Sequence, residues 1–340
     1  MSCIKNIDLF IIPGDVIVKI ANIYRYIGSN SRLQEIAGNN VNKLIDQTIE
    51  RDAFFLAKIL KLDVTDTRMR LIITKDSQPR NKEEAALFNI KETLTLYQNN
   101  YAKTFFQSND LLNLANYIFS SNTKFDYINT EKKNYFKSQS KTSKRVILDE
   151  VNENLKIKEH NQTIEKIALY LNYFVDYYNI NPLTQNNEGV SLLLLYLLCL
   201  KCDLEAFKYI SFFEQLFDKY EMFKLELNNA SLNWKEGFPQ VVSFIRFMLN
   251  LFEQSYEKAI RILKDFRFDQ SINKADNLEN TIMNMTETFS KEDIRVLHPY
   301  VSESTINRAL KKLKEEKKIR PLGKGRSAKW IRLYKGYNYD

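Results

Sequence analysis

Glycine is scarce in this chain, and its scarcity limits both the fold and the sites that the chain can build. The 340 residues include 8 glycines and 6 prolines, while Leu, Ile, Lys, Glu and Asn are abundant. Loops that wrap phosphate groups need glycine for unusual backbone angles and for close approach to the ligand. The composition therefore predicts a mainly α-helical protein, and the 44% of hydrophobic residues predicts a sizeable core.

Apolar residues recur at helical spacing through most of the chain. Helices are expected at 15–27, 40–62, 82–98, 109–119, 162–178, 190–201, 204–228 and 238–266. Residues 68–74 are expected to form a short extended stretch, and the polar segment 120–144 a surface or disordered loop. The apolar–polar pattern at 145–148 and 155–158, around the polar segment 149–154, predicts a small β-hairpin.

Positive charge is concentrated near the end of the sequence. The formal net charge is +8, and residues 301–335 contain twelve Lys or Arg against three acidic residues. This segment therefore carries a net +9, and the rest of the chain about −1. Such a distribution indicates a localised site for a polyanion.

The basic segment also has an ordered pattern. Helices are expected at 278–289 and 291–297, a turn at 298–300, and a third helix at 303–318 with Ser302 as its N-cap. Two short strands, 319–322 and 328–333, flank a turn that contains Gly323 and Gly325. This order resembles the winged helix-turn-helix domains that bind DNA.

That resemblance implies which residues contact DNA. The third helix would lie in the major groove, and the turn between the strands would contact phosphates. The DNA-contacting residues would be Ser304, Thr305, Asn307, Arg308, Lys311, Lys324, Arg326 and Lys329. A winged helix used for protein contacts, or a merely solvated basic helix, is the alternative.

Residues 28–270 resemble a divergent member of the Fic family, whose active members transfer AMP from ATP to protein hydroxyls. The resemblance lies in 78–89, in 145–158, where the family has its flap hairpin, and in 207–211, Tyr220 and Trp234. Many Fic proteins also end in a winged helix. The resemblance implies an N-terminal helical region (1–84), a Fic-like helical core with a hairpin flap (85–270) and a winged helix domain (271–340).

The active motif of the family, His-Pro-Phe-x-Asp/Glu-Gly-Asn-Gly-Arg, has a degenerate counterpart at 180–189. Pro182 and Asn187 are retained, Asn181 takes the place of the catalytic His, and Gln185 that of the metal-binding carboxylate. The two glycines and the final Arg are replaced, in order, by Asn186, Glu188 and Gly189.

These replacements remove most of the chemistry that AMP transfer needs. The amide of Asn181 cannot accept a proton near neutral pH, and neutral Gln185 is a poor ligand for Mg²⁺. Glu188 adds negative charge where a triphosphate would bind, and the Arg that clamps phosphate is lost. No cofactor is therefore expected. ATP and Mg²⁺ would be needed only under the alternative, a protein adenylyltransferase with a remodelled loop.

Two further segments resemble known motifs. Ser31 and Glu35 resemble part of the inhibitory helix of some Fic proteins, although an ordinary surface carboxylate is the favoured interpretation of Glu35. Cys199 and Cys202 have the spacing of a zinc half-site or a redox pair, but they continue an apolar helix and are expected to be reduced. With two histidines in the chain, a histidine-based catalytic triad or metal site is not expected.

The hypothesis from the sequence is a cytoplasmic, DNA-binding regulator whose Fic-like domain is inactive as an enzyme. The start of the sequence has no signal-peptide pattern, and its most apolar stretch, 191–200, is too short to span a membrane. The Fic-like domain is expected to bind a protein partner or to associate with a second copy of itself.

Overall fold

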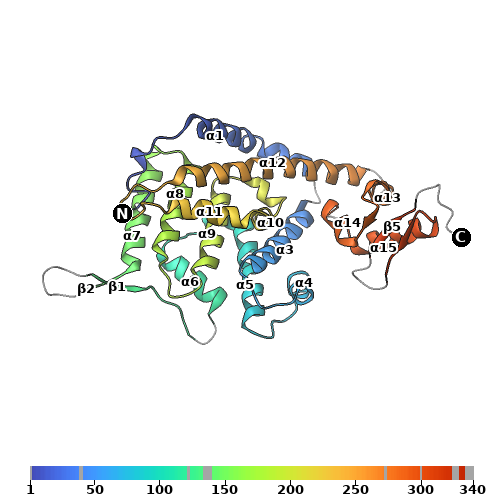
Figure 1. Ribbon diagram of the computed structural model, residues 1–340, viewed down its shortest axis with the longest axis horizontal. Helices are drawn as coiled ribbons and strands as arrows, with labels where there is room; N and C mark the ends of the chain where they lie inside the picture. Colours follow the sequence, from blue (N-terminus) through green and yellow to red (C-terminus); the bar gives the residue numbers. More distant parts are fainter. Residues whose placement is uncertain are drawn as a thin grey trace. The chain divides into compact units, whose positions relative to one another are not determined.

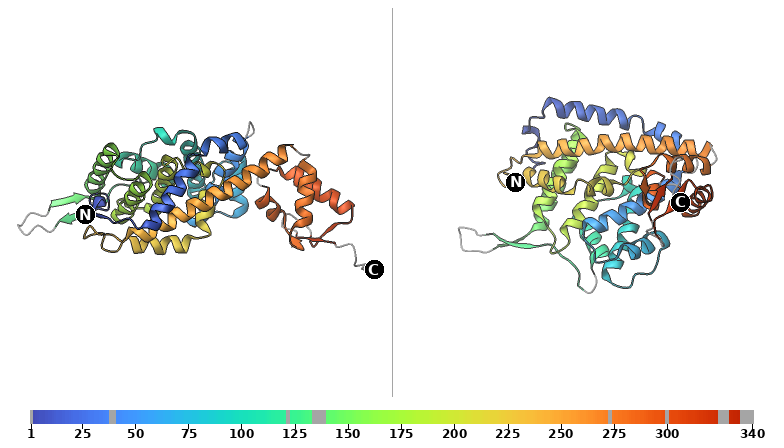
Figure 2. Two further views of the ribbon diagram at one scale, coloured as in Figure 1. Left: turned by 90° about the horizontal axis from the view of Figure 1, so that it is seen from above. Right: turned by 45° about the vertical axis from the view of Figure 1, so that its right-hand side comes forward.

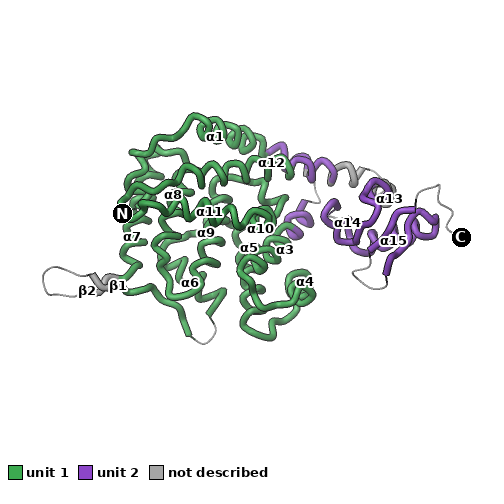
Figure 3. The backbone as a smooth tube through the Cα atoms, viewed as in Figure 1, with its two compact units in different colours: residues 1–30, 48–259 green, residues 31–47, 260–340 purple. Residues whose placement is uncertain are grey.

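The structure, a computed structural model, describes residues 2–37, 41–120, 123–132, 140–271, 274–298, 301–323 and 329–333 (Figure 1). The chain divides into two compact units (Figure 3). The first comprises Met1–Asn30 and Thr48–Ala259, and the second Ser31–Gln47 and Ile260–Asp340. The fold is mainly α-helical, as the composition predicts.

The helices and strands follow one another along the chain with short connections. The α-helices are α1 (Gly14–Ile27), α2 (Asn30–Ala37), α3 (Val41–Ile59), α4 (Asp66–Lys75), α5 (Lys82–Asn100), α6 (Ser108–Phe119), α7 (Lys144–Asn161), α8 (Lys166–Ile180), α9 (Asn187–Lys201), α10 (Phe212–Phe217), α11 (Tyr220–Ala230), α12 (Val241–Ser271), α13 (Lys274–Asn284), α14 (Lys291–Leu297) and α15 (Glu303–Glu315). The strands are β1 (Asn129–Lys132), β2 (Ser140–Ser143), β3 (Thr288–Phe289), β4 (Ile319–Pro321) and β5 (Trp330–Arg332).

The core of the first unit is built around α8 and α9. Nearly all of α8 is buried, and α9 is buried from Gly189 to Leu200. Helix α12 packs against α8, where Phe174 stacks on Phe244 with ring centroids 5.8 Å apart. Both views in Figure 2 place α1 alongside α12, and Tyr26 and Tyr256 stack between these two helices at 5.0 Å. The cysteines at the end of α9 are buried free thiols, as expected.

A buried carboxylate holds the start of the chain against α8. Asp176 accepts hydrogen bonds from Cys3 N at 2.6 Å, Ile4 N at 3.0 Å and Trp234 Nε1 at 2.7 Å. Burial raises the pKa of Asp176, while these bonds oppose the rise. Three donors therefore replace the water that a carboxylate at this depth has lost.

The hairpin predicted at 145–148 and 155–158 is wrong, because these residues form α7. Leu148, Val151 and Leu155 recur at helical spacing and make up its buried face. Ser143 caps the helix by accepting a hydrogen bond from Arg145 N. The segment read as a polar turn, 149–154, is the middle of this helix.

A hairpin does form, but it lies earlier in the chain. Strands β1 and β2 pair antiparallel, with Asn129 opposite Ser143 and Lys132 opposite Ser140. They fall within 120–144, which the sequence analysis assigned to a loop. The polar composition concealed both strands, because neither has an apolar face that would alternate along the sequence.

The extended stretch expected at 68–74 is also wrong, since it belongs to α4. Thr65 is the N-cap and accepts a hydrogen bond from Arg68 N. The guanidinium of Arg68 then pairs with Glu84 at the start of α5, at 2.9 Å. Thr65 followed by Asp66 is the helix-start signal in the sequence that predicts this helix.

The second unit contains a three-stranded antiparallel sheet in the order β3–β5–β4. Its elements follow the order α13, β3, α14, α15, β4, β5, which confirms the predicted helices at 291–297 and 303–318 and both predicted strands. The strand β3 takes up the end of the helix expected over 278–289. The hydrophobic core around this sheet is formed by Leu278, Ile282, Phe289, Ile294, Val301, Ile306, Ala309, Leu310, Leu313 and Ile319. Within the described parts of the chain, no helix has the length and apolar character needed to cross a bilayer.

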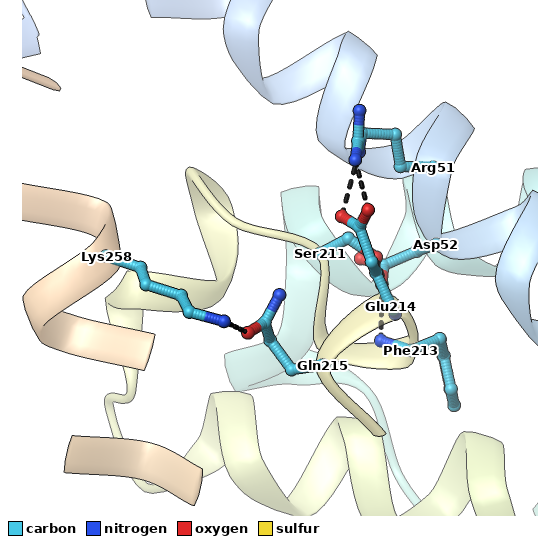
Figure 4. Close-up of polar contacts among 7 residues, drawn as sticks. All are labelled: Arg51, Asp52, Ser211, Phe213, Glu214, Gln215 and Lys258. Carbon is cyan, nitrogen blue, oxygen red and sulfur yellow. Dashed lines mark hydrogen bonds and ion pairs between the residues drawn. The ribbon is translucent and has the colours of Figure 1, made fainter. Parts of the chain in front are cut away.

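A polar cluster joins α3 to α10 inside the first unit (Figure 4). The fully buried carboxylate of Asp52 accepts hydrogen bonds from Ser211 Oγ at 2.7 Å and Phe213 N at 2.9 Å. Beside it, Arg51 pairs with Glu214 through two hydrogen bonds. Burial outweighs the hydrogen bonds that favour the charged form, and it raises the pKa of Asp52 to about 7.

This raised pKa predicts a pH-dependent stability. Because the folded carboxyl binds its proton more tightly than the unfolded one, its contribution is complete at low pH and is lost as the pH rises toward 7. Between pH 5 and 8, the free energy of unfolding should fall by about 2–3 kcal/mol more in the native protein than in Asp52→Asn. The variant keeps the Oδ1 acceptor. Denaturant titrations at both pH values measure the difference, and the exposed Asp63→Asn is the control. Parallel pH profiles for the native protein and Asp52→Asn would contradict this account.

Candidate functional site

The segment that resembles the Fic motif forms the connection between α8 and α9. Helix α8 ends where Asn181 adopts a left-handed conformation with φ 46°, and its N–H bonds Tyr177 O at 3.0 Å. Helix α9 begins after Asn186, which has φ 55°. Asparagine is among the residues that best tolerate this region. These two asparagines therefore supply two left-handed backbone turns. At one of them, Asn186, the Fic motif has glycine.

The loop between these turns is held by hydrogen bonds within the protein. The side chain of Asn187 accepts from Leu183 N at 2.8 Å and donates to Leu183 O at 2.6 Å. The segment leading into β1 pairs with the loop, because Ile128 N donates to Pro182 O and Thr184 N to Asp126 O, both at 2.9 Å. The conformation of the loop thus needs no bound ligand.

A lysine secures the end of α8. The ammonium of Lys144 donates to Ile180 O at 2.7 Å and to Asn181 O at 2.9 Å. These carbonyls carry the partial negative charge of a helix C-terminus, which a cation stabilises. Partial burial lowers the pKa of Lys144.

Next to this loop, a cavity of about 410 Å³ opens between α8, α9 and α11. Its buried floor is apolar apart from Ser191 and the Tyr177 hydroxyl. The floor residues are Phe174, Tyr177, Ser191, Leu192, Phe223 and Leu227. The residues that reach solvent form a polar rim and are Tyr178, Asn181, Asn187, Glu188, Tyr220, Lys224 and Asn228. An apolar floor with a few polar groups is typical of small-molecule sites.

The two charged residues of the rim both contact Tyr220. The hydroxyl of Tyr220 donates to Glu188 Oε1 at 2.6 Å, and Lys224 Nζ lies 5.3 Å from the centroid of its ring. Burial, followed by the bond to Glu188, raises the pKa of Tyr220. Burial and the charge of Glu188 also raise the pKa of Tyr178. Both phenols therefore stay protonated at neutral pH.

Gly189 leaves no room for a side chain. A Cβ atom at this position would lie 2.5 Å from Phe119 Cζ and 3.4 Å from Leu60 Cδ1. Gly189 aligns with the arginine of the Fic motif, so an aromatic ring of α6 fills the space from which an arginine side chain would start. The missing arginine is evident in the sequence, whereas the packing of Phe119 leaves no signal there.

The structure separates the residues of the predicted motif. Asn181 and Asn187 line the cavity, whereas Pro182 is buried outside its lining and Gln185 is exposed. Ser31 and Glu35 both lie exposed on α2, in the second unit.

Several rim residues were missed, because the helices that meet at the cavity are far apart in the sequence. Tyr178 lies on α8, whereas Lys224 and Asn228 follow Tyr220 at intervals of four on α11, which by itself marks only one face of a helix. Tyr220 was noted only through the resemblance. In the described ranges, no group of three or more His, Cys, Asp or Glu side chains is placed to hold a metal ion.

The residues predicted to contact DNA lie mostly on the exposed side of α15. Ser304, Asn307, Arg308 and Lys311 are exposed, and Thr305 is half-buried. The exposed Lys329 directly precedes β5, whereas Lys324 and Arg326 lie outside the described residues. The opposite face of α15 packs into the core through Ile306, Ala309, Leu310 and Leu313.

Two of these residues have a further role at the start of α15. The hydroxyls of Ser304 and Thr305 each lie 2.8 Å from Ser302 Oγ, which also accepts a hydrogen bond from Thr305 N. The side chains of Asn307, Arg308 and Lys311 project farther along the exposed face.

Comparison with solved structures identifies the fold. The chain is similar to a Fic family protein from Desulfovibrio desulfuricans G20, with a TM-score of 0.54, 14% identity, and coverage of 97% of this chain and 99% of that one. It is also similar to a Fic domain containing signaling protein from Bacteroides thetaiotaomicron VPI-5482, with a TM-score of 0.52, 12% identity, and coverage of 73% and 97%. No family model and no curated protein matches the sequence. The fold is therefore mainly α and Fic-like, with a small β-hairpin.

The close packing at Gly189 predicts a specific steric conflict. Gly189→Ala should destabilise the protein by about 1–3 kcal/mol, because the added methyl group overpacks against Phe119. Thermal or denaturant unfolding measures the loss. Gly14→Ala is the matched control, since a Cβ there would meet nothing within 4 Å. Adding Phe119→Leu should recover part of the loss, and an unchanged loss would show that the conflict lies elsewhere.

Proposed function

We propose that this chain, which has a Fic-like fold, is a DNA-binding regulator whose Fic-like unit does not transfer AMP. The DNA-binding module is residues 271–340, which belong to the second unit, and the Fic-like unit serves as a scaffold for a protein partner or for self-association. The observation that carries the proposal is the division of α15 into a buried apolar face and an exposed face that presents Asn307, Arg308 and Lys311.

The order of elements in the second unit supports this assignment. Helix, strand, two helices and two strands follow one another as in winged helix domains. In such domains the third helix, here α15, lies in the major groove with its exposed side chains at base edges. The excess of positive charge in 301–335 is opposite in sign to the charge of a phosphate backbone and would attract it.

Internal contacts of this module leave its outer charges available. On α14, Arg295 pairs with Glu303 at 3.0 Å and thereby fixes the start of α15. On α15, Lys312 pairs with Glu279 at 2.8 Å. The guanidinium of Arg332 donates to backbone carbonyls of Met283 and Thr286. These three cations hold the module together. Lys311 has only an exposed ion pair, 3.9 Å from Glu315 on the same helix, and such pairs contribute little. Arg308, Lys311 and Lys329 are therefore the better candidates for contacts with DNA.

The proposed loss of AMP transfer rests on residue chemistry at the loop. Asn181 lacks a basic nitrogen and Gln185 lacks the charge that Mg²⁺ prefers. Glu188 lies in the first turn of α9, where phosphate groups would otherwise approach the helix N-terminus. Transfer with a remodelled loop is the alternative, and the turns at Asn181 and Asn186 are the observation in its favour.

DNA binding is tested with variants on the exposed face of α15. A duplex is first selected from a random library with the full chain. Arg308→Ala should then weaken its binding roughly 5- to 150-fold, the effect of losing one base-edge contact. Lys329→Ala should reduce the slope of log affinity against log salt by about 1. Fluorescence anisotropy at several salt concentrations measures both.

The control for these variants is Lys82→Ala, an exposed lysine at the start of α5 in the first unit. It should leave DNA affinity unchanged. A chain that ends at residue 285 should not bind the selected duplex, and full affinity in that truncation would refute the proposal.

AMP transfer is tested directly. The purified protein, incubated with labelled ATP, Mg²⁺ and cell lysate, should transfer no label to protein above the level without enzyme. Calorimetry should detect no Mg²⁺-dependent binding of ATP. Label transfer that disappears in Asn187→Ala would establish the adenylyltransferase instead.

A further inference from the structure

The cavity between α8, α9 and α11 has a chemical character that points to its own ligand. Its floor is mostly apolar and includes Phe174, Leu192 and Phe223, with Ser191 and the Tyr177 hydroxyl as its polar groups. A volume of about 410 Å³ lies within the range of small-molecule sites. The site therefore suits a compact molecule with an apolar body.

The rim specifies the head of that molecule. Glu188 offers a carboxylate, and its second oxygen is not used by the bond to Tyr220. Lys224 offers an ammonium group over the ring of the same tyrosine. Tyr220 therefore brings one negative and one positive group to the same side of the cavity. The amide of Asn228 on the rim adds hydrogen-bonding capacity.

A ligand that matches both charges is a zwitterion. A triphosphate would gain from Lys224 but would place several negative charges beside Glu188. Among the described residues that line the cavity, Lys224 is the only cation. A simple organic cation would gain from Glu188 but would approach Lys224. An ammonium and a carboxylate attached to the same carbon atom satisfy both groups.

We propose that this cavity binds a free α-amino acid with an apolar or aromatic side chain. The ligand's ammonium pairs with Glu188, its carboxylate pairs with Lys224, and its side chain lies on the apolar floor. This inference is independent of the proposed DNA binding, because it concerns the first unit alone.

The test is calorimetry on the full chain with L-phenylalanine and L-leucine as probes. Phenethylamine and 3-phenylpropionate each lack one of the two charged groups of phenylalanine. At least one amino acid should bind, and for phenylalanine each single-charge analogue should bind at least about tenfold more weakly. ATP should not compete.

Two variants and two matched controls assign the charges. Glu188→Gln should weaken amino-acid binding and leave the binding of 3-phenylpropionate unchanged or stronger. Lys224→Met should also weaken amino-acid binding, but it should leave the binding of phenethylamine unchanged or stronger. Glu221→Gln and Lys235→Met, both exposed and outside the lining, should change nothing. Thermal unfolding of each variant confirms that it is folded.

Three outcomes would overturn the proposal. One is that neither amino acid binds. Another is that phenethylamine binds as well as phenylalanine, which would make the cavity a site for organic cations. The third is that Glu188→Gln and Lys224→Met leave amino-acid binding unchanged. DNA affinity is measured without any of these probes, so a failure here leaves the proposed DNA binding standing.

Discussion

The burial of α8 and α9 is the constraint on which the first unit depends. Both helices are apolar around most of their circumference, so neither can present a polar face to water. Other elements must cover them, and α5, α6, α7 and α12 cover most of their surface. Asp176 shows how strict the burial is, since a single carboxylate on α8 takes three hydrogen-bond donors from distant segments.

This burial explains where the polar groups of the first unit gather. The only parts of α8 and α9 that reach solvent are their ends, and the loop that joins them brings two of those ends together. Lys144 satisfies carbonyls at the end of α8, and Asn187 satisfies the backbone inside the loop. The cavity forms beside this loop because the short helix α11 covers the pair only in part and contributes tyrosine, lysine and asparagine at its edge.

Local signals in the sequence predicted the second unit well and the first unit unevenly. Ser302 as N-cap and the spacing of Ile306, Leu310 and Leu313 act within a few residues, so α15 could be placed from them. Helix α7 was mistaken for a hairpin because its apolar residues are widely spaced among charges, and a short window resembles alternation. The cavity could not be foreseen, because Tyr178, Glu188 and Lys224 meet only when three helices pack.

Glu188 connects the stability of α9 with the chemistry of the loop. A helix N-terminus carries partial positive charge from unpaired N–H groups, and a carboxylate in the first turn stabilises it by about 0.3–1 kcal/mol. Asn186 makes no side-chain hydrogen bond to cap α9, so the charge of Glu188 takes over part of the role of a cap. A bound phosphate would stabilise the same helix end in the same way. The acidic residue thus stabilises α9 in the absence of an anion, and its charge makes that end of the helix a poorer place for one.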